Sequence, residues 1–549
     1  MLNKSPGKSR KEVEVQERDS STTQDEARAG EEQTFRSLKP NAVGLVGVLF
    51  MAVATCAPIT AMAGNVPIAV GFGNGIGAPG GYIFALVVLT IFSVGFLMMA
   101  RYITTAGAFY GFISHGLGRV VGLASGLLCV FCYMIFEPAL VGIFSAFAHD
   151  TVRAQLGLNV PWPVFAGIML AAIAILTYFD INLTAKVLAV FLLTEISVLL
   201  FMAFGVLFSG GGPDGISLAP LNPINAFKGV APGLGLIFAF WSWVGFETSA
   251  VYGEESKNPK RNVPLAILIS VVGVGIFYTF VSWMAIDGNG LHQSVALAKG
   301  SNPFALFINP TREFVGGWAV TLFEWLLITG SFACGMAFHN DAARYLYNFG
   351  REGFFSRRLG ETHPVHGSPH IASFTQTAIA TLLVAVFWAT GQDPYANLYT
   401  ILAMGGTLAL LLVQTLCSFA VIGYFHVKGY HPEARNWLTT FAAPLVGGIG
   451  MIVVVFLLIT NFSTAAGSAS SSLAFKLIPW IVCAIAIGGM AFSLYLRARK
   501  PERYAILGHV VFDPSAEKVT VDTSVREDHK ISEKGTRETG REGTQQELA

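Results

Sequence analysis

Long apolar segments, separated by short polar loops, run through most of this chain of 549 residues. We identify twelve such segments, and most are long enough to cross a bilayer as a helix. They cover residues 42–70, 79–100, 121–148, 163–179, 185–208, 234–254, 264–286, 316–348, 371–390, 394–427, 437–460 and 475–497. The pattern predicts an all-α membrane protein with twelve transmembrane helices.

The two ends of the chain have a different character. Residues 1–40 are polar, with no apolar core that could act as a signal peptide. We expect this N-terminal tail and the tail of residues 498–549 to be disordered. The predicted membrane domain is therefore residues 41–497.

Charge is scarce in the body of the chain and uneven between its loops. Only 13% of the residues are charged and 53% are apolar, whereas a globular chain has about 25% charged residues. If the N-terminus is placed inside, the inner loops hold twelve Lys and Arg residues and the outer loops five. Because cytoplasmic loops carry the excess of positive charge, we expect both termini to be cytoplasmic, with the protein in the cytoplasmic (inner) membrane.

Two of the apolar segments are interrupted. The first reads VATCAPITAMAGNVP, with Pro58, Gly64 and Pro67 in an apolar run, and the sixth is broken near Gly245. Each interruption alone could be an ordinary kink. Breaks at matching places in two halves, however, are typical of inverted-repeat transporters. The offset of five segments predicts repeats at about 42–208 and 234–427, with the segments at about 437–497 peripheral.

The breaks suggest how a small zwitterion could bind. Backbone groups freed inside a membrane must face protein or a wet cavity. N–H groups at the start of a half-helix attract a carboxylate, and carbonyls at the end of one attract an ammonium. We therefore expect Thr55–Thr60 to hold a carboxylate and the carbonyls of Phe240–Val244 to accept from an ammonium.

Three motifs in order carry a family resemblance. They are GFETSAVYGEESKNPKRNVPLAI after the second break, AGAFYGFISHGLGRVVG at 106–122, and RYLYNFGREGFFSRRLGETHPVHGSPHIA at 344–372. Together with the segment count they resemble the amino acid–polyamine–organocation (APC) superfamily, as a permease of bacterial type, over roughly residues 40–500. The resemblance implies a leucine-transporter-type fold with a 5+5 inverted repeat plus two peripheral helices. It also implies amino acid transport by alternating access.

The resemblance also implies roles for particular residues. The family's span-six aromatic, which closes over the substrate, corresponds to Trp241, and its span-six glutamate corresponds to Glu247. A pocket aromatic of span eight corresponds to Phe338. The first break departs from the family because it reads TCAPIT where members often have GSG. Glu195 stands where proton-coupled members can carry a lysine.

Carboxylates inside membrane segments are functional candidates by default. Glu195 lies in mid-segment, where burial favours the protonated form and suits proton coupling; the alternative is a structural carboxylic acid. Glu137 precedes Pro138, and either faces the pocket or bonds backbone freed by the proline. Glu324 could contact an outer vestibule. A half-helix dipole at Glu247 would favour its ionised form, which makes that residue more an anchor than a proton carrier.

The charged loop after the second break has two interpretations. Glu254 and Glu255 either cap helices or form inner-gate ion pairs with residues such as Arg351. Asp341 and Arg344 are three positions apart, and a pair within one helix is the simpler expectation.

No enzyme motif, nucleotide loop or metal motif occurs, so we expect no catalytic residue, no metal and no cofactor. Six cysteines lie in apolar segments, where packing explains them better than redox chemistry. The expected partners are a small-molecule substrate, protons and the lipid bilayer, without nucleic acid. We expect a proton-coupled amino acid importer. The alternatives are an amine, polyamine or ethanolamine carrier, an amino acid exchanger, or a nutrient sensor that binds without transporting.

The expected site residues fall into two sets. The substrate-binding set is Thr55, Cys56, Ala57, Ile59, Thr60, Phe240, Trp241, Val244, Glu137 and Phe338. The proton-coupling or gating set is Glu195, Glu247 and Trp241.

Overall fold

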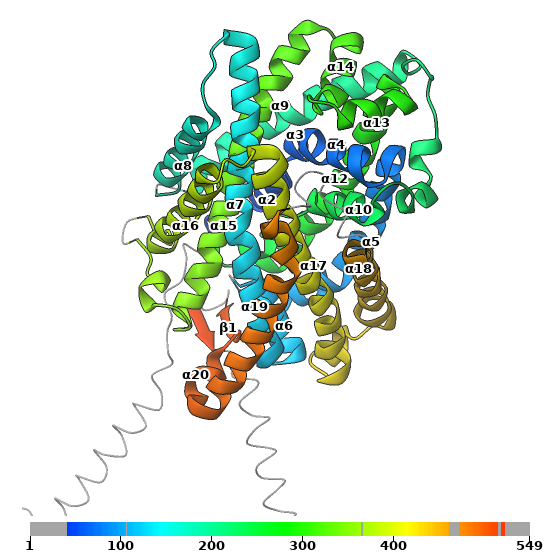
Figure 1. The fold of residues 1–549 in the computed structure, drawn as a ribbon. Helices are drawn as coiled ribbons and strands as arrows, with labels where there is room; N and C mark the ends of the chain where they lie inside the picture. The colour runs from blue at the N-terminus through cyan, green and yellow to red at the C-terminus, as the bar shows by residue number, and fades with distance from the viewer. Residues whose placement is uncertain are drawn as a thin grey trace, which may run out of the picture.

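The structure is a computed structural model that describes residues 41–105, 107–178, 181–363, 366–460, 472–513 and 518–521. The predicted N-terminal tail lies outside these residues, as does most of the C-terminal tail. Nearly all of the described chain is helical (Figure 1).

A helix occurs at each of the twelve predicted segments. The main helices are α2 Leu45–Cys56, α5 Ala78–Ala100, α7 Arg119–Leu156, α8 Trp162–Tyr178, α9 Ile181–Phe208, α10 Pro232–Trp241, α12 Pro259–Asn289, α15 Gly317–Arg351, α16 His370–Ala389, α17 Thr400–Ile422, α18 Ala443–Thr460 and α19 Leu473–Arg499. Within the described residues, ten helical segments are long and apolar enough to cross a membrane. The other two, α8 and α10, are shorter apolar helices at the fourth and sixth predicted segments.

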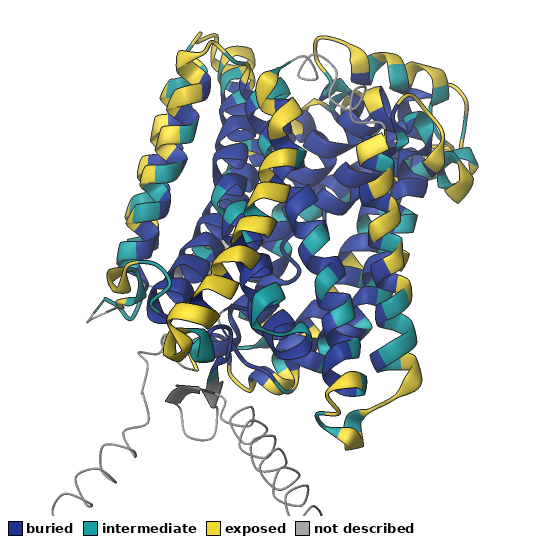
Figure 2. Cartoon of the chain, turned by 60° about the horizontal axis from the view of Figure 1, so that its bottom comes forward, coloured by how far each residue is buried: buried dark blue, intermediate teal, exposed yellow. Residues whose placement is uncertain are grey.

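Burial separates the central helices from the peripheral ones. In the most apolar stretch of α7, 83% of the residues are buried, compared with 22% in α19. Helix α7 packs against α15, α17 and α19, and α5 packs against α12 and α18. The outer faces of the peripheral helices are exposed although they are apolar (Figure 2). Exposed apolar faces of this extent indicate contact with lipid rather than water.

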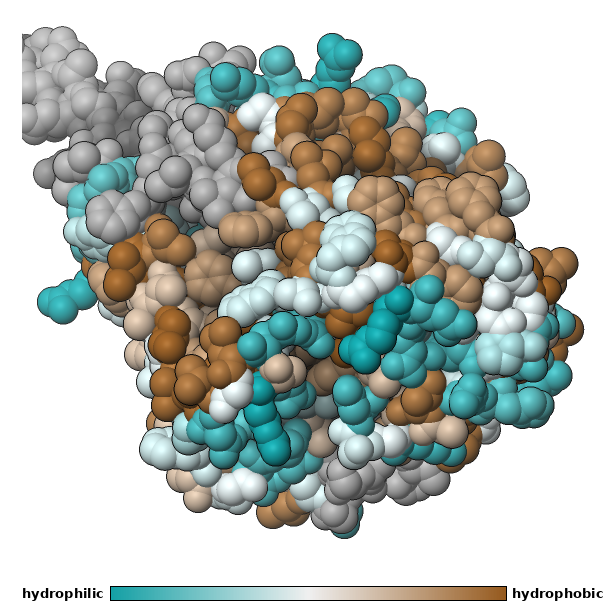
Figure 3. Space-filling model, turned by 90° about the horizontal axis from the view of Figure 1, so that it is seen from above, coloured by the Kyte–Doolittle hydropathy of each residue, from teal (hydrophilic) through white to brown (hydrophobic). Residues whose placement is uncertain are grey.

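Short elements cap the two ends of the bundle. Two helices, α13 Leu291–Lys299 and α14 Ala305–Phe314, lie at the end away from the described termini (Figure 1). Seen from above, this end mixes hydrophilic with hydrophobic side chains (Figure 3). At the opposite end lies α6, Phe109–Leu117, which packs against α7 and α17.

The prediction of an unstructured C-terminal tail is wrong for its first part. After Lys500 the chain forms α20, Pro501–Ile506, and the antiparallel strands β1 Val510–Asp513 and β2 Lys518–Val521. The N–H of Gly508 donates to both carboxylate oxygens of Glu352, at 3.2 and 3.3 Å. The His509 ring stacks on His115 with centroids 4.2 Å apart. These contacts hold the segment against the bundle, so the all-α prediction misses a small hairpin.

Candidate substrate site between two broken helices

The first break lies at Ala57. Helix α2 ends at Cys56, and Ala57 adopts the left-handed conformation with φ 45° and ψ 73°. The helix restarts at Pro58 and continues through α and π turns to Gly73. Left-handed backbone is strained for a residue with a Cβ. A strained residue before a proline, deep in an apolar segment, is a feature that a merely structural helix would lack.

The second break lies between Trp241 and Thr248. Helix α10 ends at Trp241, and a short helix, α11 Thr248–Val251, follows after a series of turns. Gly245 has φ +120°, which a residue with a side chain adopts only under strain. The unwound stretch therefore includes Val244 and Gly245, as the sequence predicts.

The two breaks contact each other. A Cβ added to Gly245 would lie 2.5 Å from the Cβ of Thr55, so the backbone there must be glycine. The Cys56 thiol donates to the Trp243 carbonyl at 3.3 Å, and the Tyr278 hydroxyl donates to the Cys56 carbonyl at 2.6 Å. Carbonyls freed by unwinding are thus partly satisfied by side chains of neighbouring helices, as the membrane interior requires.

A small cavity lies where the broken helices meet. Its lining residues are Thr55, Cys56, Ala57, Thr60, Ala61, Asn65, Leu140, Trp241, Ser242, Cys334, Phe338 and Tyr399. Its volume is about 10 Å³, close to the minimum for one water molecule. The hydroxyl of Thr60 is buried there without a hydrogen-bond partner. A buried polar group without a partner is costly, so this hydroxyl is available to a ligand once the cavity opens.

Stacked aromatic rings close one side of the cavity. The rings of Trp241 and Phe338 stack at 5.6 Å with an interplanar angle of 11°. Phe136 lies against both of them, at 4.4 and 5.0 Å. The Trp241 indole N–H donates to the Tyr399 hydroxyl at 2.8 Å, and that hydroxyl donates to Asn65. The indole is therefore held by a specific hydrogen bond in addition to apolar contact.

The structure gathers six of the ten predicted substrate residues around this cavity. They are Thr55, Cys56, Ala57, Thr60, Trp241 and Phe338. The other four, Ile59, Phe240, Val244 and Glu137, are buried but do not line it.

Sequence reasoning missed several lining residues. Asn65, Ser242 and Tyr399 form a hydrogen-bonded chain, in which Asn65 donates to Ser242 at 2.8 Å. Asn65 is a polar residue in the apolar stretch after the first break, and it could have been noticed on that ground. Tyr399 comes from the tenth segment, and nothing in its neighbours along the chain indicates its place.

Glu195 lies against the first break. Its side chain is buried, and its carboxylate lies near the backbone N–H of Ile59. That N–H belongs to the first turn after Pro58, where helical N–H groups have no partner within the helix. A Cβ added to Gly330 of α15 would lie 2.6 Å from Ile59 and 2.7 Å from the Glu195 carboxylate. Glu195 thus joins α9 to the broken helix and to α15.

Glu247 lies at the second break. One carboxylate oxygen accepts from the Tyr133 hydroxyl at 2.7 Å, and the other accepts from the N–H of Gly245 at 3.1 Å. Glu247 immediately precedes α11. These bonds tie the turn to α7, and the anchoring role of Glu247 stays a prediction.

Glu137 does not line the cavity and belongs to a buried polar network. One of its carboxylate oxygens lies 3.0 Å from Nδ1 of His339 and accepts from Gln376 at 2.8 Å. Nε2 of His339 lies 2.8 Å from the Ser373 hydroxyl. The order carboxylate, imidazole, hydroxyl is that of a hydrolase triad. This network does not line the cavity but joins α7, α15 and α16. The second carboxylate oxygen of Glu137 is buried without a hydrogen-bond partner.

Two buried ion pairs close the end of the bundle that carries the termini. Arg351 donates to both carboxylate oxygens of Glu254, at 3.0 and 2.9 Å. Arg344 donates to both oxygens of Glu255, at 2.8 and 3.0 Å. The pair expected within one helix is not formed, because Arg344 points to Glu255 while Asp341 accepts from Thr248. The two pairs join the loop after α11 to α15, and the interpretation of this loop as an inner gate stays a prediction.

Comparison with known proteins places the chain in a family. The model of the family described as "Amino acid permease" matches residues 43–487, well over half of the chain. The chain belongs to the amino acid permease family. The protein is therefore a multi-pass membrane transporter rather than an enzyme, and its two helix breaks lie within the matched region.

Individual relatives are distant and varied. The branched-chain amino acid permease BcaP of Bacillus subtilis (strain 168) is 21% identical over 69% of this chain and 79% of its own length. The glutamate/gamma-aminobutyrate antiporter of Lactococcus lactis subsp. lactis (strain IL1403) is 24% identical over 66% and 73%. The low-affinity putrescine importer PlaP of Escherichia coli (strain K12) is 24% identical over 62% and 74%. Their names cover amino acids and amines, so identity alone does not select a substrate.

Proposed function

We propose that this protein is a secondary active transporter that imports a neutral amino acid across the cytoplasmic membrane by alternating access. The observation that carries the proposal is the meeting of two broken helices at an enclosed cavity, with the unpartnered Thr60 hydroxyl in its wall. Freed backbone groups of opposite polarity at one place suit a zwitterion.

Each part of an amino acid has a matching element. The carboxylate would bind at the start of the half-helix that begins at Pro58, beside Thr60. The ammonium would bind the carbonyls at the end of α10, near Ser242. The side chain would lie against Trp241, Phe338 and neighbouring apolar groups. The aromatic pair would have to separate from the cavity to admit the substrate.

A neutral side chain suits the wall of the cavity. Among the lining residues that the structure describes there is no Asp, Glu, Lys or Arg. A second ammonium or carboxylate on the substrate would need such a partner, because burying an unpaired charge is expensive. Glu137, the candidate for an extra amine, does not line the cavity, and one of its carboxylate oxygens is bonded to His339 and Gln376. The amine or polyamine carrier and the exchanger remain the second candidate, supported by the names of the putrescine and glutamate/gamma-aminobutyrate relatives.

Proton coupling would act through Glu195. The carboxylate of Glu195 lies near the N–H of Ile59, one residue before Thr60. Protonation would remove the negative charge at the start of the half-helix where the substrate carboxylate is expected. Binding of the proton and binding of the substrate would then strengthen each other, because Glu195 and the substrate carboxylate would no longer both be negatively charged. The twelve-span arrangement with a 5+5 inverted repeat and two cytoplasmic termini belongs to the same proposal.

The test is uptake of labelled substrates by proteoliposomes. We expect saturable uptake of one or more neutral amino acids, with little uptake of putrescine or glutamate. Preferential uptake of putrescine would show that the substrate is an amine and not a neutral amino acid. Specific binding without uptake of any tested compound would favour the nutrient sensor.

A further inference from the structure

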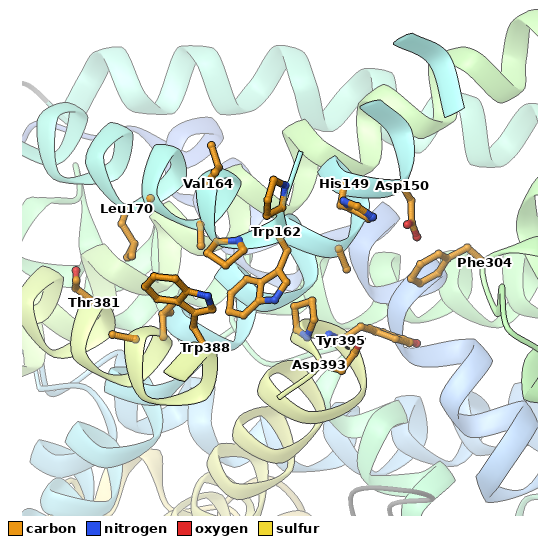
Figure 4. Close-up of a pocket in the computed structure, with 18 of the residues that line it drawn as sticks. His149, Asp150, Trp162, Val164, Leu170, Phe304, Thr381, Trp388, Asp393 and Tyr395 are labelled. Atoms are coloured by element: carbon orange, nitrogen blue, oxygen red, sulfur yellow. Dashed lines mark hydrogen bonds between the residues drawn. The ribbon is translucent and has the colours of Figure 1, made fainter. Parts of the chain in front are cut away.

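A groove much larger than the central cavity lies away from the two helix breaks (Figure 4). It lies between α8 and α16, with the end of α7 and the segment before α17 closing its top, and its volume is about 1050 Å³. Ile168 and Leu382, on the two flanking helices, are 57% and 64% exposed. The groove therefore borders the surface that faces lipid.

The polarity of the groove changes along its length. Its upper end, where α7 ends and the tenth segment begins, carries His149, Asp150 and Asp393, which Figure 4 shows to the right of Leu170. The rest of the groove, between α8 and α16, is lined mainly by apolar residues such as Leu170. From Pro161 to Leu170 the groove follows α8 for roughly 14 Å. One leaflet of a bilayer has a hydrocarbon depth of about 15 Å.

The charges at the upper end are arranged for a zwitterion. Asp150 and Asp393 both line this end of the groove, from two different segments, so a cation bound between them would face two carboxylates. Arg153, one helical turn beyond Asp150, lines the adjoining cavity together with Glu324. A ligand that carries a positive group and, a few ångströms away, a negative group would therefore meet a charge of opposite sign at each of them.

Two tryptophans mark the depth of this end. Trp162 begins α8 and Trp388 lies near the end of α16, and both line the groove (Figure 4). Tryptophan is enriched where membrane helices pass through the headgroup region. The charged end of the groove thus lies at headgroup level, while the apolar part lies at the level of the acyl chains.

We propose that this groove binds one phospholipid with a primary ammonium headgroup, a phosphatidylethanolamine. The ammonium lies at Asp150 and Asp393, the phosphate lies toward Arg153, and one acyl chain lies between α8 and α16. A lipid with a net negative headgroup is disfavoured because the described lining of the groove contributes two carboxylates and no Lys or Arg, and because Arg153 in the adjoining cavity is accompanied by Glu324.

The acyl part of the proposal is tested by filling the groove. Gly167 lines it, and a Cβ added there would meet nothing within 4 Å, so Gly167→Leu occupies the groove without disturbing the helix. Gly488 of α19 is equally open but lies outside the groove, which makes Gly488→Leu the matched control. Native mass spectrometry of delipidated protein titrated with palmitoyl-oleoyl phosphatidylethanolamine counts the bound lipid. We expect one retained lipid in wild type and control, and its loss in Gly167→Leu.

The headgroup part is tested by charge. We expect wild type to retain phosphatidylethanolamine over phosphatidylglycerol of the same chains by about fivefold, from two exposed charge contacts. The double variant Asp150→Asn/Asp393→Asn should bring the ratio near one; asparagine at 393 still caps the following turn, where Asp393 accepts from Tyr395 and Ala396. Glu313→Gln, an exposed carboxylate outside the groove, should leave the ratio unchanged.

Three outcomes would overturn the proposal. The first is equal lipid retention by Gly167→Leu and wild type. The second is the absence of a headgroup preference in wild type. The third is displacement of the lipid by free ethanolamine or putrescine at equal concentration, which would make the upper end a site for soluble amines.

Discussion

Breaking the buried pair between Arg351 and Glu254 should open the cavity toward the end that carries the termini. The two side chains are 2% and 0% exposed and share two hydrogen bonds, at 2.9 and 3.0 Å. Removing one partner of such a pair costs about 3–5 kcal/mol, because the remaining charge stays buried. In Arg351→Gln this loss of free energy destabilises the closed conformation, because Glu254 becomes hydrated once the gate opens. Even about 3 kcal/mol shifts the closed-to-open equilibrium more than 100-fold.

A cysteine of the protein itself reports the opening. Cys56 lines the cavity and is 2% exposed in the closed conformation. Its modification by N-ethylmaleimide, followed by mass spectrometry of the peptide, should be much faster in Arg351→Gln than in wild type. Arg312→Gln, an exposed arginine at the other end, is the matched control. The double variant Glu254→Gln/Arg351→Gln removes both charges and should return the rate toward wild type. Unchanged Cys56 modification in folded Arg351→Gln would refute the gate.

Three further predictions follow from the same contacts. Gly245 has φ +120° and lies against Thr55, so Gly245→Ala should lower the free energy of unfolding by about 1–3 kcal/mol in thermal unfolding. The control Gly273→Ala, where a Cβ would meet nothing within 4 Å, should be neutral. Equal unfolding temperatures for the two variants would contradict the close contact between Gly245 and Thr55. Glu137→Leu should lower the unfolding temperature but leave substrate selectivity unchanged. Altered selectivity would indicate that Glu137 belongs to the substrate site. Burial raises the pKa of Glu352 from 4.5 to about 7, so the folded state binds the proton more tightly and stability falls as pH rises from 4.5 through about 7, by at most about 3 kcal/mol. Thermal unfolding against pH should show this loss, and Glu352→Gln should flatten it.

The sequence predicts the helices and the breaks because both depend on local chemistry. Apolar length alone locates a membrane helix. Counted through their breaks and π turns, the helical segments begin and end within a few residues of the predicted ones, except that α7 continues to Leu156. Pro58 and Gly245 mark the breaks for the same reason, since each changes the backbone at its own position. The C-terminal hairpin escapes prediction because its docking contacts, such as Gly508 with Glu352, are distant in sequence.

The candidate site is only partly predictable for a related reason. Residues next to the breaks, such as Thr60 and Trp241, line the cavity as expected. Tyr399 joins them from a distant helix, and only the packing of that helix brings it there. Glu137 is the opposite case. The sequence around a buried carboxylate is the same whether the side chain contacts a ligand or another residue of the protein, such as His339. The direction of a side chain around a buried helix depends on the tertiary arrangement.

Proton-driven uptake tests the central claim most directly. Proteoliposomes containing wild type or Glu195→Gln are loaded at one pH and diluted into a lower pH, and initial uptake of a transported neutral amino acid is measured with and without this inward proton gradient. Exchange of unlabelled for labelled substrate at equal pH shows that both proteins are folded and bind. The account predicts that the gradient accelerates wild-type uptake, while Glu195→Gln still exchanges substrate but no longer responds to the gradient. A gradient response of the same size in Glu195→Gln, or none in wild type, would contradict the account.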